Sequence, residues 1–427
     1  MDSEQRRDLA VWGSLAAAGL LICALAATVD APLGTAGPPF LGRYAVAVSP
    51  ATLLAAAVAG AGLWLSTTGW YDRLSWRRLL LGGYALGLAW ILSLALTDGL
   101  AGLTRPLDDT HGAAADVAGV GTDPFGWLGR FTSDQTDQSW HSRGHPPGAV
   151  LLLWSLQRVG ITGELPLGLL LAAGGALVVP LVLWAARDLS GEVTARRYLP
   201  LVALAPYALW AVHPDVIAAV LGAAMLVAGA WASRRRGVPA ALAGLLCGVL
   251  LGLAALITYA AAWLGLSVVC LYFARRRPLL NVVTGAGALV PPLLAQLAGF
   301  SWVAGMLAAQ HDYATRVEPY RSGLWWAALS LVALLLVAGP ALVASLRKLR
   351  NTPGWPYLVG AGAAVLFSVL AGFARGGIEH AWLAFFPWLT IAAVAPERPG
   401  GAPAPTPLLL AGAGALTALL LAAVVEF

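Results

Sequence analysis

Apolar runs of about 20 residues alternate with short polar connectors along almost the whole chain. That length matches the roughly 20 residues that a helix needs to cross about 30 Å of hydrocarbon. Because backbone amides in lipid must be paired internally, the runs are predicted to be helices. Thirteen membrane spans are predicted, at residues 9–27, 46–65, 79–97, 166–186, 198–213, 215–233, 238–257, 259–274, 279–299, 323–345, 356–374, 379–395 and 406–425.

One apolar run, residues 149–161, is only 13 residues long and contains Arg158. Runs of that length more often lie along a membrane surface than cross it. If this run lies on the outer surface, 18 of the 26 basic residues fall in loops on the inner side, as the positive-inside rule requires. A crossing run would place the basic loop 187–197 outside. The sequence therefore predicts a cytoplasmic N-terminus and a surface helix at residues 149–161.

Composition supports the same class. The chain is 59% hydrophobic and only 11% charged, whereas soluble domains carry about 25% charged residues. The sequence pI near 9.3 does not indicate nucleic-acid binding, because the arginines fall in short clusters between spans. We expect an all-α, multi-pass protein of the plasma membrane. A cleaved signal peptide is the alternative for the first run, which follows Arg6 and Arg7.

Three parts are predicted. Residues 1–78 supply two N-terminal spans, residues 79–395 form a core with outer loops at 99–165 and 300–322, and residues 396–427 form a Pro-rich inner linker and the last span.

The longest polar stretch, residues 104–148, holds six of the 21 carboxylates and three of the six histidines. With the predicted topology, all six histidines and 14 of the 21 carboxylates lie on or near the outer face. Ionisable groups near a membrane usually mark a pathway or a site, so their clustering predicts one outward-facing polar cavity.

Adjacent carboxylates at Asp108 and Asp109 begin this stretch. Two carboxylates at a surface of low dielectric repel each other, so one pKa rises and the other falls. One of them can then act as general base toward an acceptor hydroxyl. The other, Asp109, can hold a divalent cation such as Mg²⁺ or Mn²⁺, or orient the nucleophile. A plain helix cap is the alternative for the pair.

Several motifs carry a resemblance to GT-C glycosyltransferases, which include protein O-mannosyltransferases and lipid A aminoarabinose transferases. The segment 105–111 (RPLDDTH) is similar to the acidic-pair motif of their first large outer loop, and 145–148 (HPPG) resembles their HPP or KPP segment. The segment 183–191 (LWAARDLSG) resembles an inner RxLxG turn, and 213–215 (HPD) stands where a polar outer turn is common. Gly377-Ile378-Glu379-His380 resembles a late acidic motif before a membrane helix.

This resemblance covers about residues 78–395 and implies transfer of a sugar from a polyprenyl-phosphate donor outside the cytoplasm. It implies an inverting reaction with Asp108 or Asp109 as base, and a glycan, lipid or protein as acceptor. Three features depart from the family pattern: two extra spans come first, the pair is Asp-Asp rather than Asp-Glu, and a large soluble C-terminal domain is missing. Its motifs and the outer polar positions together give these candidate substrate-binding residues: His111, Arg143, His145, His213, Asp215, Arg321, Arg375, Glu379 and His380.

Arg143, Arg321 and Arg375 are candidates for the lipid phosphate, because a guanidinium offers a planar fork to phosphate oxygens. Contacts to lipid headgroups explain them equally well. The spacing His141-x-x-x-His145 suits a zinc pair only in a helix, and Gly144 and Pro146 argue against a helix there.

A secondary transporter or lipid flippase is the main rival function. Such proteins place ionisable residues near the middle of the membrane, often between two repeated halves. Charges within the predicted spans are scarce and no internal repeat is evident, which favours the glycosyltransferase. A structural assembly partner with a decayed site is a third hypothesis.

Overall fold

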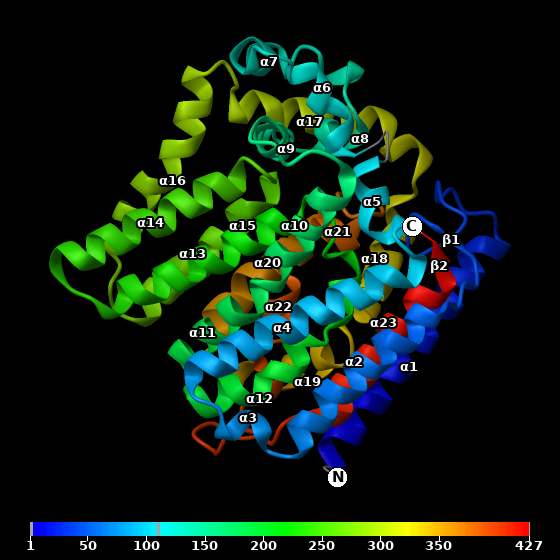
Figure 1. Ribbon diagram of the computed structural model, residues 1–427, viewed down its shortest axis with the longest axis vertical. Helices are drawn as coiled ribbons and strands as arrows, with labels where there is room; N and C mark the ends of the chain where they lie inside the picture. The colour runs from blue at the N-terminus through cyan, green and yellow to red at the C-terminus, as the bar shows by residue number, and fades with distance from the viewer. Residues whose placement is uncertain (1–2, 109–111, 427) are drawn as a thin grey trace.

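The computed structural model describes residues 3–108 and 112–426, without the side chains of Asp108 and Glu426 (Figure 1). Helices make up nearly all of it, which confirms the predicted all-α class. Two short strands, β1 (Arg43–Tyr44) and β2 (Val425–Glu426), pair antiparallel, with Arg43 opposite Glu426. This pairing joins the connection after the first helix to the end of the last one.

Seven helical segments among the described residues are long and apolar enough to cross a membrane. An eighth is added if α17 (Trp302–Arg316), η6 (Glu318–Tyr320) and α18 (Gly323–Ala338), which bend by 98°, are one span. The protein is therefore a multi-span helical membrane protein. The seven segments are α1 (Ser3–Thr28), α2 (Pro50–Thr67), α4 (Trp76–Ala95) with η1 (Leu96–Asp98), α10 (Glu164–Ala176) with α11 (Val178–Ser190), α13 (Val216–Arg234), α14 (Gly237–Ala255) and α16 (Leu280–Leu297).

Three apolar helices are shorter: α15 (Ala262–Ala274) with η5 (Tyr259–Ala261), α20 (Trp355–Leu370) and α23 (Leu408–Val424). Residues 323–345 divide between α18 and α19 (Ala341–Arg347), with Gly339 and Pro340 between the two helices. Two further predicted spans are not single helices either, so all three predictions were wrong. Residues 198–213 divide between α12 (Glu192–Ala203) and η4 (Pro206–Trp210), and 379–395 contains α22 (Phe386–Leu389), η8 (Ile391–Val394) and part of α21 (Ile378–Ala381). Pro206 and Pro387 lack the N–H that a continuing helix needs. Both stretches are largely buried in the bundle, so their apolar character reflects packing inside the protein.

Small residues let the helices approach closely. Helix α14 packs along α13 and α16, and a Cβ placed on Gly248 would collide with the backbone of α16 at Thr284. Close packing through glycine replaces the hydrophobic driving force that helices lack in lipid. Helix α1 contacts α18, α19 (Ala341–Arg347) and α23, and α2 contacts α4 and α23.

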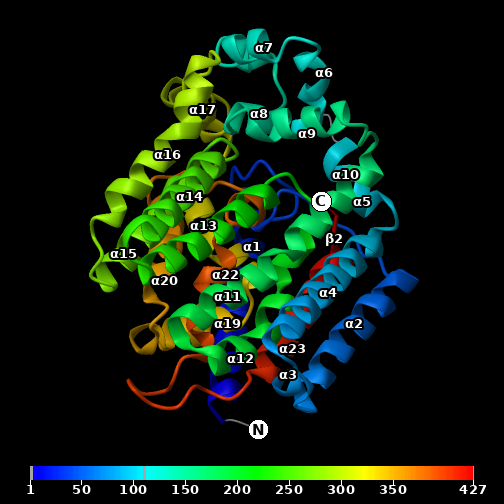
Figure 2. The same cartoon turned by 60° about the vertical axis from the view of Figure 1, so that its left-hand side comes forward.

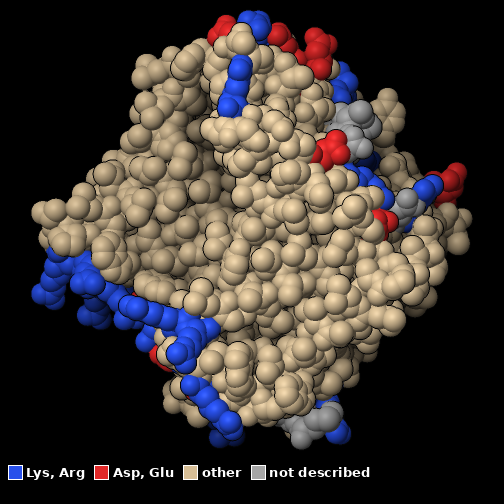
Figure 3. All heavy atoms as spheres, in the orientation of Figure 1, with Lys and Arg blue, Asp and Glu red and all other residues tan. Residues whose placement is uncertain are grey.

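Basic side chains gather on one side of the bundle. Figure 3 shows Lys and Arg along its lower left edge and base, where the connections α13–α14 and α15–α16 lie in Figure 1. Buried carboxylates on this side are paired with arginine: Asp188 with Arg234 and Arg275, and Asp8 with Arg347. Gly191, at φ 87°, ends α11 beside Asp188, in a backbone region that favours glycine. Short segments complete this basic side: α3 (Trp70–Arg73) and η7 (Leu349–Asn351).

The opposite end carries a cap of short helices, which Figure 2 places together with α17. The predicted helix at 149–161 is α9, an 11-residue helix too short to cross a membrane. Trp154 and Arg158 both donate to the Gly121 carbonyl, at 2.9 and 2.8 Å, which holds α9 against the preceding loop. The cap consists of α5 (Ala101–Asp108), η2 (Ala113–Asp116), α6 (Val117–Val120), α7 (Pro124–Arg130), η3 (Gln135–Asp137), α8 (Trp140–Gly144) and α9 (Gly148–Arg158).

Candidate functional site

Four histidines and two carboxylates converge beneath the cap, from three segments far apart in the sequence. The cap helix α8 brings His141 and His145, the turn before α13 brings His213 and Asp215, and α21 brings Glu379 and His380. Ring contacts link the histidines: the centroids of His141 and His145 are 4.2 Å apart, and those of His213 and His380 are 4.1 Å apart. We call these six residues the histidine cluster.

Helix α8 forms despite Gly144 and Pro146, so the prediction that this stretch is not helical was wrong. Ser139 caps its N-terminus by accepting a hydrogen bond from the Ser142 N–H, and the Ser139 hydroxyl donates to Asp116 at 2.6 Å. A capping side chain satisfies N–H groups that the first turn leaves unpaired, so even one turn can form. Pro146 lies beyond the end of α8 and does not interrupt it. The turn stacks His141 on His145 with nearly parallel rings.

His145 and Asp215 face each other across the cluster. The His145 Nδ1 atom lies 2.9 Å from the His141 carbonyl oxygen, and Nε2 lies 3.7 Å from Asp215 Oδ1. A carbonyl oxygen can only accept, so the Nδ1–H of His145 donates to it. The other ring nitrogen, Nε2, points at Asp215. The other carboxylate oxygen of Asp215 lies 3.4 Å from His213 Nδ1.

Several buried polar atoms of the cluster have no hydrogen-bond partner among the described residues: His141 Nε2, Asp215 Oδ1, Glu379 Oε2 and His380 Nδ1. Asp215 is 6% exposed and Glu379 is 2% exposed. Leaving a buried polar group without a hydrogen bond lowers the stability of the fold by about 1–3 kcal/mol. A concentration of such groups therefore indicates a functional site.

Burial and neighbouring charges set the protonation of the cluster. Burial lowers the pKa of His141 well below its usual value, and His145 adds to this effect, so the imidazole is neutral. Burial alone would raise the pKa of Asp215, but His145 and His213 outweigh it and hold the pKa well below its usual range. The cluster therefore presents a neutral imidazole beside a carboxylate.

Glu379 and His380 shift in opposite directions. Burial raises the pKa of Glu379 to about 7, against the opposing influence of its own backbone N–H, His213 and Arg321. Burial lowers the pKa of His380 to about 3, and His213 adds to the shift. Perturbed titratable groups of this kind concentrate at functional sites.

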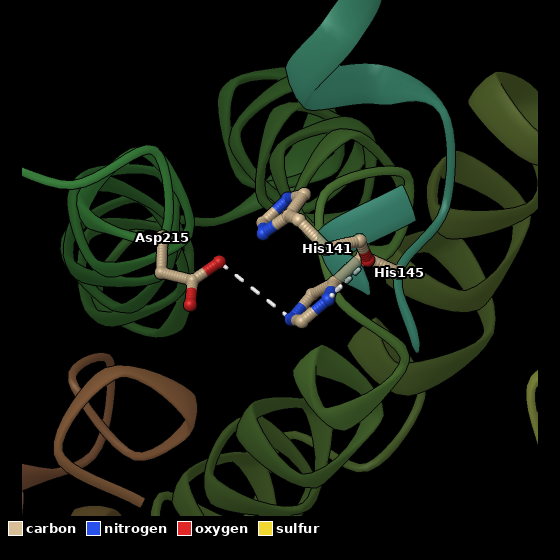
Figure 4. A group of neighbouring side chains, drawn as sticks. All are labelled: His141, His145 and Asp215. Atoms are coloured by element: carbon tan, nitrogen blue, oxygen red, sulfur yellow. Dashed lines mark hydrogen bonds and ion pairs between the residues drawn. The ribbon is translucent and has the colours of Figure 1, made fainter. Parts of the chain in front are cut away.

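His141, His145 and Asp215 could hold a metal ion. Each offers one ligand atom, and these atoms all lie within 4.8 Å of one another. Figure 4 shows both imidazoles and the carboxylate turned toward the same space, from α8, its end and the start of α13. This is not the predicted metal position, Asp109, which lies outside the described residues.

The three predicted phosphate-binding arginines differ in their surroundings. Arg321 donates to the Arg375 carbonyl at 2.8 Å, and Arg375 donates to the carbonyls of Gly372, Glu318 and Arg321. These two side chains tie the α17–α18 connection to the turn before α21. Arg143 is buried, and its guanidinium carbon lies 4.4 Å from the Trp140 ring centroid. Its Nε has no hydrogen-bond partner in the described part of the chain, which leaves it more available to a ligand.

A cavity of about 250 Å³ lies next to the cluster. His380 lines one part of it, and Arg105 and Pro106 of α5 line another. Arg105 pairs with Asp98 at 2.6 Å at the cavity wall. Most other lining residues are apolar: Ala45, Ala47, Leu94, Ala95, Leu209, Trp210, Val212, Ala422 and Val425.

Of the predicted catalytic pair, the structure describes only the backbone of Asp108. Asp108 is the last residue of α5, two residues after Pro106 at the cavity. The side chain of Asp108, together with Asp109 and His111, lies outside the described residues. Of the predicted binding residues, the cluster unites His145, His213, Asp215, Glu379 and His380. The predicted site set omitted His141, although its i, i+4 spacing to His145 and the capping serine at 139 were visible in the sequence.

No protein-family model matches this chain, and no curated protein sequence is significantly similar to it.

Proposed function

We propose that the protein is a membrane glycosyltransferase of GT-C type, which moves a sugar from a polyprenyl-phosphate donor to an acceptor on the extracytoplasmic side. The observation that carries the proposal is the cavity between the end of α5 and His380. Apolar side chains line most of it, while the Asp98–Arg105 pair and His380 add polar atoms. A donor with a lipid chain and a charged sugar-phosphate head needs such a mixed surface.

In the proposed reaction, Asp108 or Asp109 acts on the hydroxyl group of the acceptor. The carboxylate takes the proton of the acceptor hydroxyl, and the acceptor oxygen bonds to the anomeric carbon of the sugar. The acceptor attacks the face opposite the leaving group, which inverts the anomeric carbon, and polyprenyl phosphate leaves with the electrons of the broken bond. We assign the base to Asp108, the first acid of the motif. Arg143, with its unpaired Nε, is the candidate to stabilise the negative charge that develops on the phosphate.

The distribution of charge favours an enzyme over a transporter. In the seven candidate spans, every charged residue lies near an end of its helix. A transporter would place ionisable groups around a site at the middle of the membrane. The histidine cluster instead lies at one end of the bundle, under the cap helices.

Sugar transfer by Asp108→Asn and Asp109→Asn variants tests the proposal. Loss of a general base lowers the rate about 10²–10⁴-fold, so at least one variant should lose that much transfer from a polyprenyl-phosphate sugar. Asp123→Asn is the matched control. Asp123 is an exposed carboxylate among the same short helices, and its side chain caps the N-terminus of α7 by accepting a hydrogen bond from the Gly126 N–H. Asparagine caps helices as well as aspartate, so that variant should keep full activity. Near-full turnover of both test variants removes the catalytic assignment. Failure of the unsubstituted protein with every polyprenyl-phosphate sugar tried removes the proposed function.

A further inference from the structure

The unpaired atoms of the histidine cluster form a set that hydrogen bonding alone does not explain. His141 Nε2 and Asp215 Oδ1 are buried and have no hydrogen-bond partner among the described residues, and both belong to the three-residue group whose ligand atoms lie within 4.8 Å. His141 is 9% exposed and Asp215 is 6% exposed. The third member, His145, directs Nε2 toward Asp215 at 3.7 Å. Two imidazole nitrogens and one carboxylate oxygen therefore face one space (Figure 4).

We propose that His141, His145 and Asp215 bind a zinc ion. Two imidazole nitrogens and a carboxylate are the ligand set of open zinc sites, in which a fourth position takes water or a ligand oxygen. Magnesium and calcium prefer sites made of oxygen atoms only, so they fit poorly. The affinity order of divalent metals places zinc above manganese and iron for such donors.

The distances suit zinc after a small contraction. Tetrahedral ligands about 2.0–2.1 Å from zinc lie about 3.3 Å from one another. The His145–Asp215 pair, at 3.7 Å, is already close to that separation. The His141 nitrogen lies within 4.8 Å of the other two ligand atoms, so it would approach them by up to about 1.5 Å when zinc binds.

Neighbouring contacts hold the proposed ligands in their binding orientation. The His141 carbonyl oxygen lies 2.9 Å from His145 Nδ1, and His213 Nδ1 lies 3.4 Å from the second oxygen of Asp215. In zinc sites, the second ring nitrogen of a ligating histidine usually donates to a carbonyl or carboxylate. Both His145 and Asp215 have such supporting partners here.

Zinc binding can be measured on the full chain in detergent without any sugar donor, so the result does not depend on the proposed transfer activity. The protein is stripped with a chelator, reloaded with Zn²⁺ and analysed by mass spectrometry of the metal. We expect one zinc per chain. His141→Asn and Asp215→Asn should each weaken binding by more than about 100-fold, beyond the effect typical of supporting residues. His311→Asn, which changes an exposed histidine of α17, should bind zinc as the unsubstituted protein does.

X-ray absorption of the zinc-loaded, unsubstituted protein keeps the proposal testable if the variants fail to fold. The spectrum should show scattering from two imidazoles. A shell of oxygen or sulfur atoms alone, no retained zinc, or equal binding by well-folded His141→Asn and Asp215→Asn variants would each overturn it.

Discussion

On the basic side of the molecule buried carboxylates accept hydrogen bonds from arginine. In the histidine cluster on the opposite side, several buried polar atoms have no hydrogen-bond partner among the described residues. Asp8 and Asp188 illustrate the first arrangement, since each accepts hydrogen bonds from guanidinium groups. His141 and Asp215 illustrate the second. Removing one partner of a buried pair leaves an uncompensated charge, so the basic side should govern stability. The cluster keeps its unpaired atoms at an energetic cost, and such costs are tolerated where a ligand provides the missing contacts.

The largest expected effect lies on the basic side. Arg347 donates to both oxygens of the buried Asp8, at 2.8 Å each. Arg347→Ala leaves that carboxylate unpaired and should lower the free energy of unfolding by about 3 kcal/mol, the low end for buried pairs because the Arg347 side chain is 26% exposed. Unfolding of the detergent-solubilised protein by SDS measures the change, with Arg350→Ala at an exposed position of the same connection as control. A loss below about 1 kcal/mol contradicts the assignment of stability to this side.

A slightly smaller effect, of opposite sign, is expected in the cluster for Glu379→Gln. Burial raises the pKa of Glu379 to about 7 from the 4.5 of a free side chain. The folded protein thus favours protonated Glu379, and this contribution to stability is present below pH 4.5 and is lost as the pH rises through 7. Neutral glutamine avoids the loss. At pH 8 the variant should be about 2–3 kcal/mol more stable than the unsubstituted protein, and at pH 5 nearly equal to it.

Thermal unfolding at both pH values measures this difference. Glu164→Gln, at an exposed glutamate on the first turn of α10, is the control and should not change the pH dependence. Equal stability of Glu379→Gln and unsubstituted protein at pH 8 would show that the carboxyl is solvated or paired when ionised.

The smallest effect concerns the positioning of α8. Ser139 caps this helix, and losing such a cap costs about 1 kcal/mol. Ser139→Ala should weaken zinc binding about fivefold, the equilibrium change that 1 kcal/mol produces, without removing a ligand. The control is Ser133→Ala. Ser133 lies in the same layer of short helices, but its hydroxyl is exposed, so this variant should bind zinc normally. A loss as large as that of Asp215→Asn would mean that Ser139 does more than position the helix.

Hydropathy predicts which parts of the chain are helical, but it does not predict whether each apolar run forms one unbroken helix. The apolar run that forms α13 and the run that forms α14 appear as expected, because lipid-facing and buried helices are both apolar. The same signal misassigned residues 198–213 and 379–395. An apolar run that is broken by proline and buried within the protein has the hydropathy of a span.

The site was partly predictable for a different reason. Polar residues beside predicted spans, such as His213, Asp215, Glu379 and His380, stand out against apolar surroundings. Their meeting with α8 depends on packing between segments about 70 to 240 residues apart, which spacing along the chain does not encode. Gly144 and Pro146 predict no helix at His141, whereas the side chain of Ser139 caps one helical turn that ends before Pro146.

The partners of α1 also fix an order of events during synthesis. Trp12 donates to the Leu335 carbonyl at 2.8 Å, and Asp8 meets Arg347, a residue 339 positions later. At about 5–20 residues per second, roughly 20–70 s separate the translation of the two. Helix α1 is therefore made long before Arg347, the residue that pairs with Asp8 in the folded protein. A chain whose synthesis stops before position 347 would lack the guanidinium that Asp8 contacts in the folded protein.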